Sequence, residues 1–148
     1  MQSGFQDRTP LFDASYTYDA AGNRTGRKES FLHRTDNRQE TLITEYGYDS
    51  MNRLVAENCG DSRISYRYDL SGNRISRVTD GRTENYLYNS RNQLTELTGE
   101  NKHIRYTYDP AGNLVEEHSA DHKRIYAYDA YNRNIEIAGN DFTQKNHY

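Results

Sequence analysis

The sequence is organised by a tandem repeat, Tyr-x-Tyr-Asp, that recurs along most of its 148 residues. Successive Asp positions, with Asn in the fourth copy, are separated by 30, 20, 20, 20 and 20 residues, and twelve of the fourteen tyrosines belong to these copies. The six copies are Tyr16, Tyr18 and Asp19; Tyr46, Tyr48 and Asp49; Tyr66, Tyr68 and Asp69; Tyr86, Tyr88 and Asn89; Tyr106, Tyr108 and Asp109; and Tyr126, Tyr128 and Asp129. Such a period predicts a repeat architecture in which each unit packs against its sequence neighbours.

A tight turn is predicted directly after each copy. Asp109, Pro110 and Gly112 occupy the first, second and fourth positions that these residues favour in a type I β-turn. The fourth position alternates between glycine and asparagine, which tolerate positive φ. These residues are Gly22, Asn52, Gly72, Asn92, Gly112 and Asn132. The alternation predicts a bulged β-hairpin at every repeat and a superperiod of two repeat subtypes.

A second, less regular turn is predicted halfway through each repeat, for example at Gly60-Asp61 and at Asp80-Gly81. Each repeat is therefore two strands of about six residues, and short connections force antiparallel neighbours. The longer first step predicts an extended hairpin over residues 24–46 that turns at Asp36-Asn37. We expect an N-terminal lead-in over 1–15, six repeats over 16–138 and a polar C-terminal tail over 139–148.

Strand alternation assigns the tyrosines to one face of the sheet. Ile64, Tyr66 and Tyr68 point one way, whereas Arg67 points the other way. Because tyrosine strands recur every second strand, an aliphatic residue of the return strand is expected between successive tyrosine pairs. The candidates are Leu54, Leu94 and Leu114. The predicted fold is all-β: tandem antiparallel hairpins in one curved, spiralling and open sheet, with a ladder of Tyr, Leu and Tyr on one face.

Composition supports a core built from tyrosine. Leu, Ile, Val and Phe make up about 16% of the chain, below the roughly 20% at which disorder becomes a serious interpretation. The net charge of −3 and the aromatic content of 12% oppose that interpretation. The sequence contains no segment typical of a membrane span or signal peptide, and Cys59 has no disulfide partner. Interspersed acids and bases give no basic stripe for nucleic acid.

The side chains that could catalyse a reaction or bind a metal are better explained as parts of turns. His118 and His122 flank a predicted turn, so solvated turn residues are favoured over a metal pair. The repeated aspartates could be calcium ligands, but an aspartate that caps the backbone of a type I turn explains them without an ion. No catalytic motif is present, so we expect no enzyme activity and no cofactor.

The repeats resemble the YD-repeat or Rhs-repeat family. Its signature, an aromatic residue, any residue, Tyr-Asp, two residues, Gly or Asn, Arg or Asn and Leu, is matched best from Tyr108 to Leu114 and from Tyr68 to Arg74. Two turns are weaker matches, because Asn89 replaces the aspartate and Asn134 stands where leucine is usual. The resemblance implies a long β-strip that spirals into a hollow shell, as in bacterial Rhs and polymorphic toxins and animal teneurins.

The resemblance also carries expectations about function. It implies a non-catalytic segment of a secreted or cell-surface shell that encloses a C-terminal toxin. Neither a self-cleaving core nor a toxin domain follows the repeats, so we interpret the chain as a piece of a longer array. Expected partners are further repeats, another copy bound at a sheet edge, an enclosed toxin domain or glycans. As an alternative, exposed tyrosines such as Tyr106 and Tyr108 would stack on carbohydrate.

Overall fold

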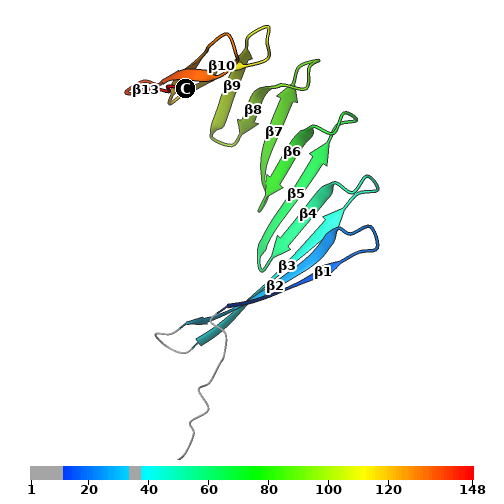
Figure 1. Cartoon of the computed structure of the whole chain (residues 1–148). Coiled ribbons are helices and arrows are strands. Elements are labelled where there is room, and N and C mark those ends of the chain that lie inside the picture. Colours follow the sequence, from blue (N-terminus) through cyan, green and yellow to red (C-terminus); the bar gives the residue numbers. More distant parts are fainter. Residues whose placement is uncertain (1–11, 34–37) are drawn as a thin grey trace, which may run out of the picture. The chain divides into compact units, whose positions relative to one another are not determined.

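The computed structural model describes residues 12–33 and 38–148, and these residues form β-strands joined by tight turns (Figure 1). The strands are β1 (Phe12–Tyr18), β2 (Arg24–His33), β3 (Arg38–Tyr48), β4 (Leu54–Cys59), β5 (Ser62–Tyr68), β6 (Arg74–Thr79), β7 (Arg82–Tyr88), β8 (Leu94–Gly99), β9 (Lys102–Tyr108), β10 (Leu114–Ser119), β11 (Lys123–Tyr128), β12 (Asn134–Ala138) and β13 (Thr143–Lys145). Their order in the sheet is their order in the chain. The predicted fold class, antiparallel hairpins in one open sheet, is confirmed.

The chain divides within β5 into two compact units, residues 1–65 and 66–148. In the first unit, the extended hairpin expected over residues 24–46 is formed by β2 and β3, which pair from Gly26 with Glu45 to His33 with Arg38. The turn predicted at Asp36-Asn37 lies outside the described residues. In the second unit, β6 to β13 form consecutive antiparallel pairs. Each unit is therefore a series of hairpins.

The halfway turns are two-residue connections in several repeats. Thr79 pairs with Arg82, and the two residues between them have positive φ, 50° at Asp80 and 83° at Gly81. That combination is a type I′ turn, whose twist matches the twist of the flanking strands. The Asp-Gly sequence is among its preferred fillings, so this connection follows from local sequence alone.

A β-bulge follows each repeat turn whose strand register is described. The register shifts between Leu87 and Tyr88 on β7 and at the same repeat position on β1, β3 and β11. In the pair of β9 and β10 the shift lies between Leu114 and Glu116 of β10. The bulge places Leu94 opposite Tyr88 and Leu97 opposite Tyr86. Leu94 and Leu97 therefore both lie on the tyrosine face. Strict alternation would place two residues that are three apart on opposite faces.

The apolar core is a row of side chains across β7, β8 and β9. Tyr86 and Leu97 are each 6% exposed, Ile104 is 9% exposed, and Leu97 is the cross-strand partner of both. Tyr88, Leu94 and Tyr106 pack against this row. The ladder of Tyr, Leu and Tyr is therefore present in the second unit. In the first unit the buried residues are polar, Glu29 and Thr44.

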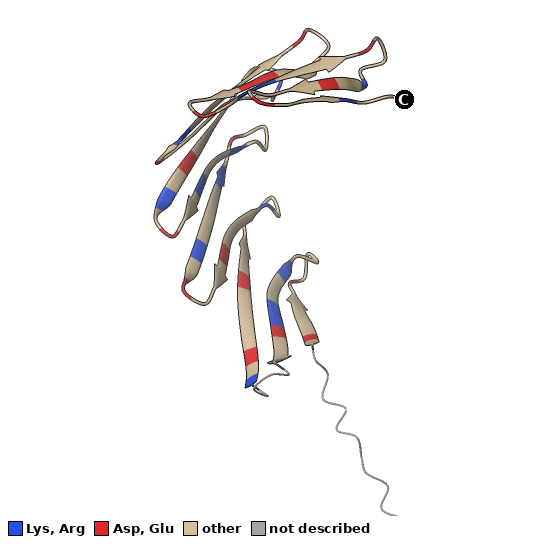
Figure 2. Ribbon diagram, turned by 90° about the vertical axis from the view of Figure 1, so that its left-hand side faces the viewer, with Lys and Arg blue, Asp and Glu red and all other residues tan. Residues whose placement is uncertain are grey.

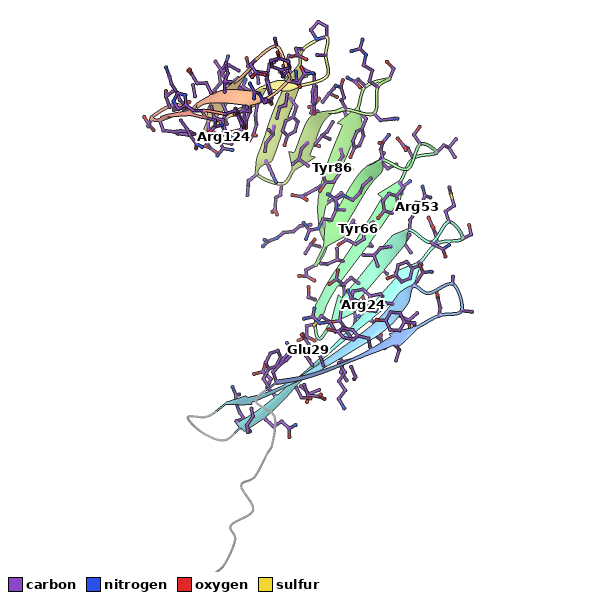
Figure 3. All side chains as sticks on the ribbon, in the orientation of Figure 1. Arg24, Glu29, Arg53, Tyr66, Tyr86 and Arg124 are labelled. Carbon is purple, nitrogen blue, oxygen red and sulfur yellow. The ribbon has the colours of Figure 1, made fainter. Side chains whose placement is uncertain are left out.

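Arginine replaces leucine between the rings in two repeats, which corrects the expectation of an aliphatic residue at every step. The Arg24 guanidinium carbon lies 5.4 Å from the Tyr16 ring centroid and 4.9 Å from that of Tyr46. The Arg74 guanidinium carbon lies 5.7 Å from the Tyr66 ring centroid and 4.7 Å from that of Tyr86. Both tyrosines are labelled in Figure 3. A guanidinium satisfies this position because it stacks on aromatic faces while its stem supplies apolar contact.

The C-terminal segment expected to be a polar tail contains one more hairpin. β13 pairs with β12, joining Thr143 to Ala138. Tyr148 lies 20 residues after Tyr128, and its hydroxyl donates a 3.1 Å hydrogen bond to the carbonyl of Asn134. At the other end, β1 begins at Phe12, inside the segment expected to be a lead-in.

Candidate functional site

The repeat turns have one hydrogen-bond pattern. In the first turn, Asp19 Oδ1 accepts hydrogen bonds from the backbone N–H groups of Ala21 at 2.9 Å and Asn23 at 2.8 Å. The Gly22 N–H also donates to the Asp19 carbonyl at 3.1 Å. The amide oxygen of Asn89 makes the same two backbone contacts in the fourth turn, at 2.9 and 3.1 Å. The turn therefore requires a side-chain oxygen that accepts these two hydrogen bonds, and that oxygen can belong to a charged aspartate or a neutral asparagine.

The fourth position of each turn is left-handed, as the alternation of glycine and asparagine predicts. The φ angles are 85° at Gly22, 59° at Asn52, 89° at Gly72, 59° at Asn92, 95° at Gly112 and 59° at Asn132. Glycine meets this requirement without strain, and asparagine is among the side chains that tolerate it. The backbone requirement is the same in both subtypes.

Successive turns are joined in pairs by asparagine side chains, which the sequence alone did not reveal. Asn23 Nδ2 donates both to Asp19 Oδ2 at 3.0 Å and to Asn52 Oδ1 at 2.8 Å. The same bond joins Asn73 to Asn92 and Asn113 to Asn132, each at 2.9 Å. The asparagine subtype thus supplies an acceptor that glycine lacks. This bond gives the superperiod a structural role.

The turn aspartates are held in their charged form. The pKa values of Asp19, Asp69 and Asp109 lie below the ordinary value of 3.8, chiefly because asparagine side chains donate hydrogen bonds to the carboxylates. The pKa of Asp49 is lowered mainly by the Arg53 backbone N–H, and that of Asp129 by the Arg133 side chain. Among the described residues, no group of three or more His, Cys, Asp or Glu side chains is arranged to hold a metal.

Lowering the pH is expected to destabilise the protein through these aspartates. In the unfolded chain the carboxyls titrate near 3.8, and in the folded chain they titrate below it. Their contribution is therefore complete above 3.8 and is lost as the pH falls through the folded pKa values. Urea unfolding followed by circular dichroism between about pH 5 and pH 2 measures this loss.

The matched variant for the pH prediction is Asp69→Asn, which gives the third turn the acceptor that Asn89 already provides in the fourth. Its stability should fall less steeply with pH than that of the original chain. Equal pH dependence in both proteins would show that Asp69 does not contribute.

The tyrosine hydroxyls tie neighbouring hairpins together. Tyr48 donates to the Arg24 carbonyl at 3.0 Å, Tyr88 to Arg74 at 3.1 Å and Tyr108 to Leu94 at 2.8 Å. Burial raises the pKa of both Tyr106 and Tyr108 above the ordinary value. The two tyrosines suggested as glycan contacts are partly buried, and the hydroxyl of Tyr108 is bonded to the Leu94 carbonyl.

A shallow groove lies beside those two tyrosines. Its volume is about 490 Å³, and its lining includes Arg91, Gln93, Tyr106, Tyr108 and Pro110. Arg91 Nη1 donates to the Pro110 carbonyl at 3.2 Å, and Gln93 Nε2 to the Gly112 carbonyl at 3.3 Å. The groove thus combines aromatic surface with polar groups.

Ser119, His122 and Glu117 are linked by hydrogen bonds in the order nucleophile, base and acid, as in a catalytic triad. Ser119 Oγ lies 2.9 Å from His122 Nδ1, and His122 Nε2 lies 2.8 Å from Glu117 Oε1. However, Ser119 Oγ also accepts hydrogen bonds from the backbone N–H groups of Asp121 and His122 at 3.2 and 3.1 Å. A serine that accepts such bonds caps a turn. We therefore assign this cluster to the β10–β11 turn, and His118 on the same strand is exposed.

Charges of both signs are interspersed in each unit (Figure 2). Several form cross-strand pairs, such as Lys102 with Glu84 at 3.4 Å and Lys123 with Glu116 at 3.0 Å. Among the described residues there is no helix with the length and hydrophobicity needed to cross a membrane.

The comparison with protein families agrees with the turn and ladder geometry. The family model described as RHS Repeat matches residues 88–124. These residues are similar to an RHS repeat. The matched segment includes the turns after Tyr88 and Tyr108, so the resemblance found in the sequence is confirmed there. No curated protein matches the chain. RHS repeats are structural and generally non-catalytic, and they are typically found in extracellular or cell-surface proteins.

Proposed function

We propose that the chain is a segment of the β-shell of an RHS-repeat protein, secreted or displayed on the surface of a bacterial cell, and that the complete shell encloses a toxin or other cargo domain. The supporting observation is the identical turn in all six repeats, with pairs of turns joined by asparagine side chains. Such a unit extends a sheet by adding copies of itself, since each repeat contacts its neighbours.

The role of this segment is mechanical. Each hairpin presents a tyrosine strand and a return strand. The next hairpin pairs with that return strand, so that the Arg or Leu residue of the return strand lies between successive tyrosine rings. The wall in the complete protein would separate the cargo from the cell that makes it. The partly buried tyrosines serve this wall through packing and through hydroxyl bonds to the preceding hairpin.

The test uses the natural polypeptide that contains these residues. We expect further repeats on at least one side, and a cargo domain that resists trypsin until denaturant unfolds the repeats. Electron microscopy should then show a hollow particle. A cargo domain cleaved at the same rate with and without folded repeats would contradict enclosure, while the structural role of the repeats would stand.

Carbohydrate binding is a second candidate because the groove beside Tyr106 and Tyr108 combines aromatic and polar groups. Titration with an oligosaccharide panel should quench tyrosine fluorescence saturably, and Tyr106→Ala should abolish the quenching without loss of strand content. An unchanged fluorescence signal with every oligosaccharide would remove this candidate.

A further inference from the structure

Charged residues that face each other across neighbouring strands are commonly of opposite sign in the second unit. Such pairs are Arg77 with Glu84, Glu117 with Arg124 and Glu136 with Lys145. One row differs, because His118 on β10 faces Arg105 on β9 and Lys123 on β11. Arg105 stands between Ile104 and Tyr106 in β9, so alternation places this row on the face opposite the tyrosines. Three basic side chains therefore occupy one row, although like charges opposed across strands are destabilising.

The protein leaves part of this row unpaired. Lys123 is paired with Glu116 Oε2 at 3.0 Å. The other cross-strand neighbour of Arg105 is Glu96, but Glu96 Oε1 lies 2.6 Å from His103 Nε2. Within residues 12–33 and 38–148, the side chains of Arg105 and His118 make no hydrogen bond or ion pair. A departure from a local rule with no compensation inside the protein is expected at functional sites.

A hollow lies beside the row. Its volume is about 360 Å³, and its lining residues are His103, Arg105, His118, Ser119 and Ala120. Ser119 and Ala120 are small and belong to the end of β10 and its turn, so they leave room next to the three larger side chains. The volume is within the range of small-molecule sites. Two imidazoles and one guanidinium therefore border a space that can hold a small ligand.

We propose that this hollow binds a tetrahedral oxyanion, a phosphate or sulfate group. The Arg105 guanidinium supplies a permanent positive charge and a planar fork that donates two parallel hydrogen bonds to such an anion. His118 and His103 add donors when they are protonated. A metal cation is disfavoured in the same hollow because Arg105 would repel it. The site lies on the face opposite the tyrosine ladder and does not depend on the shell role.

Anion binding at this hollow is expected to depend on pH. Histidine changes charge between about pH 5 and pH 8, and a bound anion favours the charged form, so protonation and binding strengthen each other. Sulfate is the appropriate probe because it keeps its double negative charge over this range. The charged groups that face the two histidines are Glu96 on β8, Arg105 on β9, Glu116 on β10 and Lys123 on β11.

Titration of the full chain with sodium sulfate, followed by heteronuclear NMR, tests the site. The backbone amide signals of Arg105 and His118 should shift saturably, whereas sodium chloride of equal ionic strength should not produce that saturable shift. Arg105→Gln should raise the dissociation constant about tenfold or more, because it removes the charged hydrogen bonds. The original chain should bind sulfate more tightly at about pH 6 than at about pH 8, and His118→Gln should reduce that difference.

Arg67→Gln is the matched control. Arg67 is exposed on β5 and does not line the hollow, so the variant removes the same charge at a different place. It should leave the dissociation constant for sulfate unchanged. Equal weakening by Arg67→Gln and Arg105→Gln would overturn the proposal, since sulfate would then respond to net charge alone. The absence of a saturable shift at both pH values would also overturn it.

Two further probes distinguish a free anion from an anionic group on a larger molecule. Inorganic phosphate should compete with sulfate for the same signals. Galactose 6-sulfate carries the same group as an ester, and equal affinity for it and for sulfate would show that the site binds the oxyanion itself. Tighter binding of the ester would show that the site also contacts the sugar. Failure of phosphate to displace sulfate would overturn a site for tetrahedral oxyanions. The shell role is measured separately by the protease experiment on the natural polypeptide.

Discussion

Replacing Tyr86 by alanine is expected to lower the free energy of unfolding by about 3 kcal/mol. Tyr86 is 6% exposed, and it packs on Leu97 across the strand and on the Arg74 guanidinium. Its hydroxyl also donates to Glu84 Oε2 at 2.8 Å. The variant removes the largest side chain of the core row and leaves a cavity that the strand backbones cannot close. Urea unfolding followed by circular dichroism measures the change.

The matched control is Tyr16→Ala, at the same position of the first repeat. Tyr16 is 45% exposed and shares Arg24 with Tyr46, so its loss should cost about 1 kcal/mol or less. Both variants replace tyrosine by alanine, so the difference between their losses in the free energy of unfolding measures the effect of burial. Equal losses at Tyr16 and Tyr86 would show that the row across β7, β8 and β9 is not the core.

Tyr86→Phe separates the ring from the hydroxyl. It keeps the packing and removes the hydrogen bond to Glu84, so the expected loss is about 1 kcal/mol. The pKa of Glu84 is lowered chiefly by that hydroxyl, and it should rise towards the ordinary value in this variant. A loss as large as that of the alanine variant would mean that the hydrogen bond, and not the ring, stabilises the row.

The sequence was sufficient to predict the hairpins and the positive φ positions, because both depend on residues close together in the chain. Gly22 and Asn52 mark the same backbone state with different side chains, and the 20-residue spacing determines which strands are neighbours. The tyrosine face also follows from local alternation. β5 shows it directly, since Ile64, Tyr66 and Tyr68 are partly buried whereas Arg67 is exposed.

The alternation of glycine and asparagine predicted a bulged hairpin at each turn, but the register shift within the paired strands, such as that between Leu87 and Tyr88, could not be predicted from the period. A bulge places two residues opposite one, and a repeat of 20 residues is compatible with strands that have it or lack it. Its consequence is that Leu94 and Leu97 both face tyrosines, although their spacing assigns them to opposite faces. The tyrosine ladder was therefore predicted correctly at Leu94, while Leu97, its most buried aliphatic residue, was missed.

The asparagine bonds between turns and the stacked arginines were also beyond local patterns. Whether Asn23 reaches Asn52 depends on the separation of two turns in space. An arginine at the position where leucine is usual does not by itself indicate that its guanidinium stacks on tyrosine rings. One missed feature did have a signal in the sequence. Tyr148 continues the spacing from Tyr128, but Asn146 replaces the first tyrosine of that pair, so the seventh copy is incomplete.

Replacing Gly72 by valine is expected to lower the free energy of unfolding by about 2 kcal/mol. Gly72 has φ of 89°, and a Cβ atom added there would meet nothing within 4 Å. The cost therefore comes from the backbone, because a β-branched residue at positive φ is strongly disfavoured. Thermal and urea unfolding of the variant measure it.

Gly72→Asn is the control, since Asn52, Asn92 and Asn132 occupy the same position with φ of 59°, and it should cost about 1 kcal/mol or less. The reverse exchange tests the turn-to-turn bond. Asn92→Gly keeps the backbone state but removes the oxygen that accepts from Asn73 at 2.9 Å, so a loss of about 1 kcal/mol is expected. If Asn92→Gly stabilised the protein, backbone freedom alone would explain the alternation. If it destabilised the protein while Gly72→Asn did not, the two subtypes would differ because each pair of turns needs one asparagine acceptor.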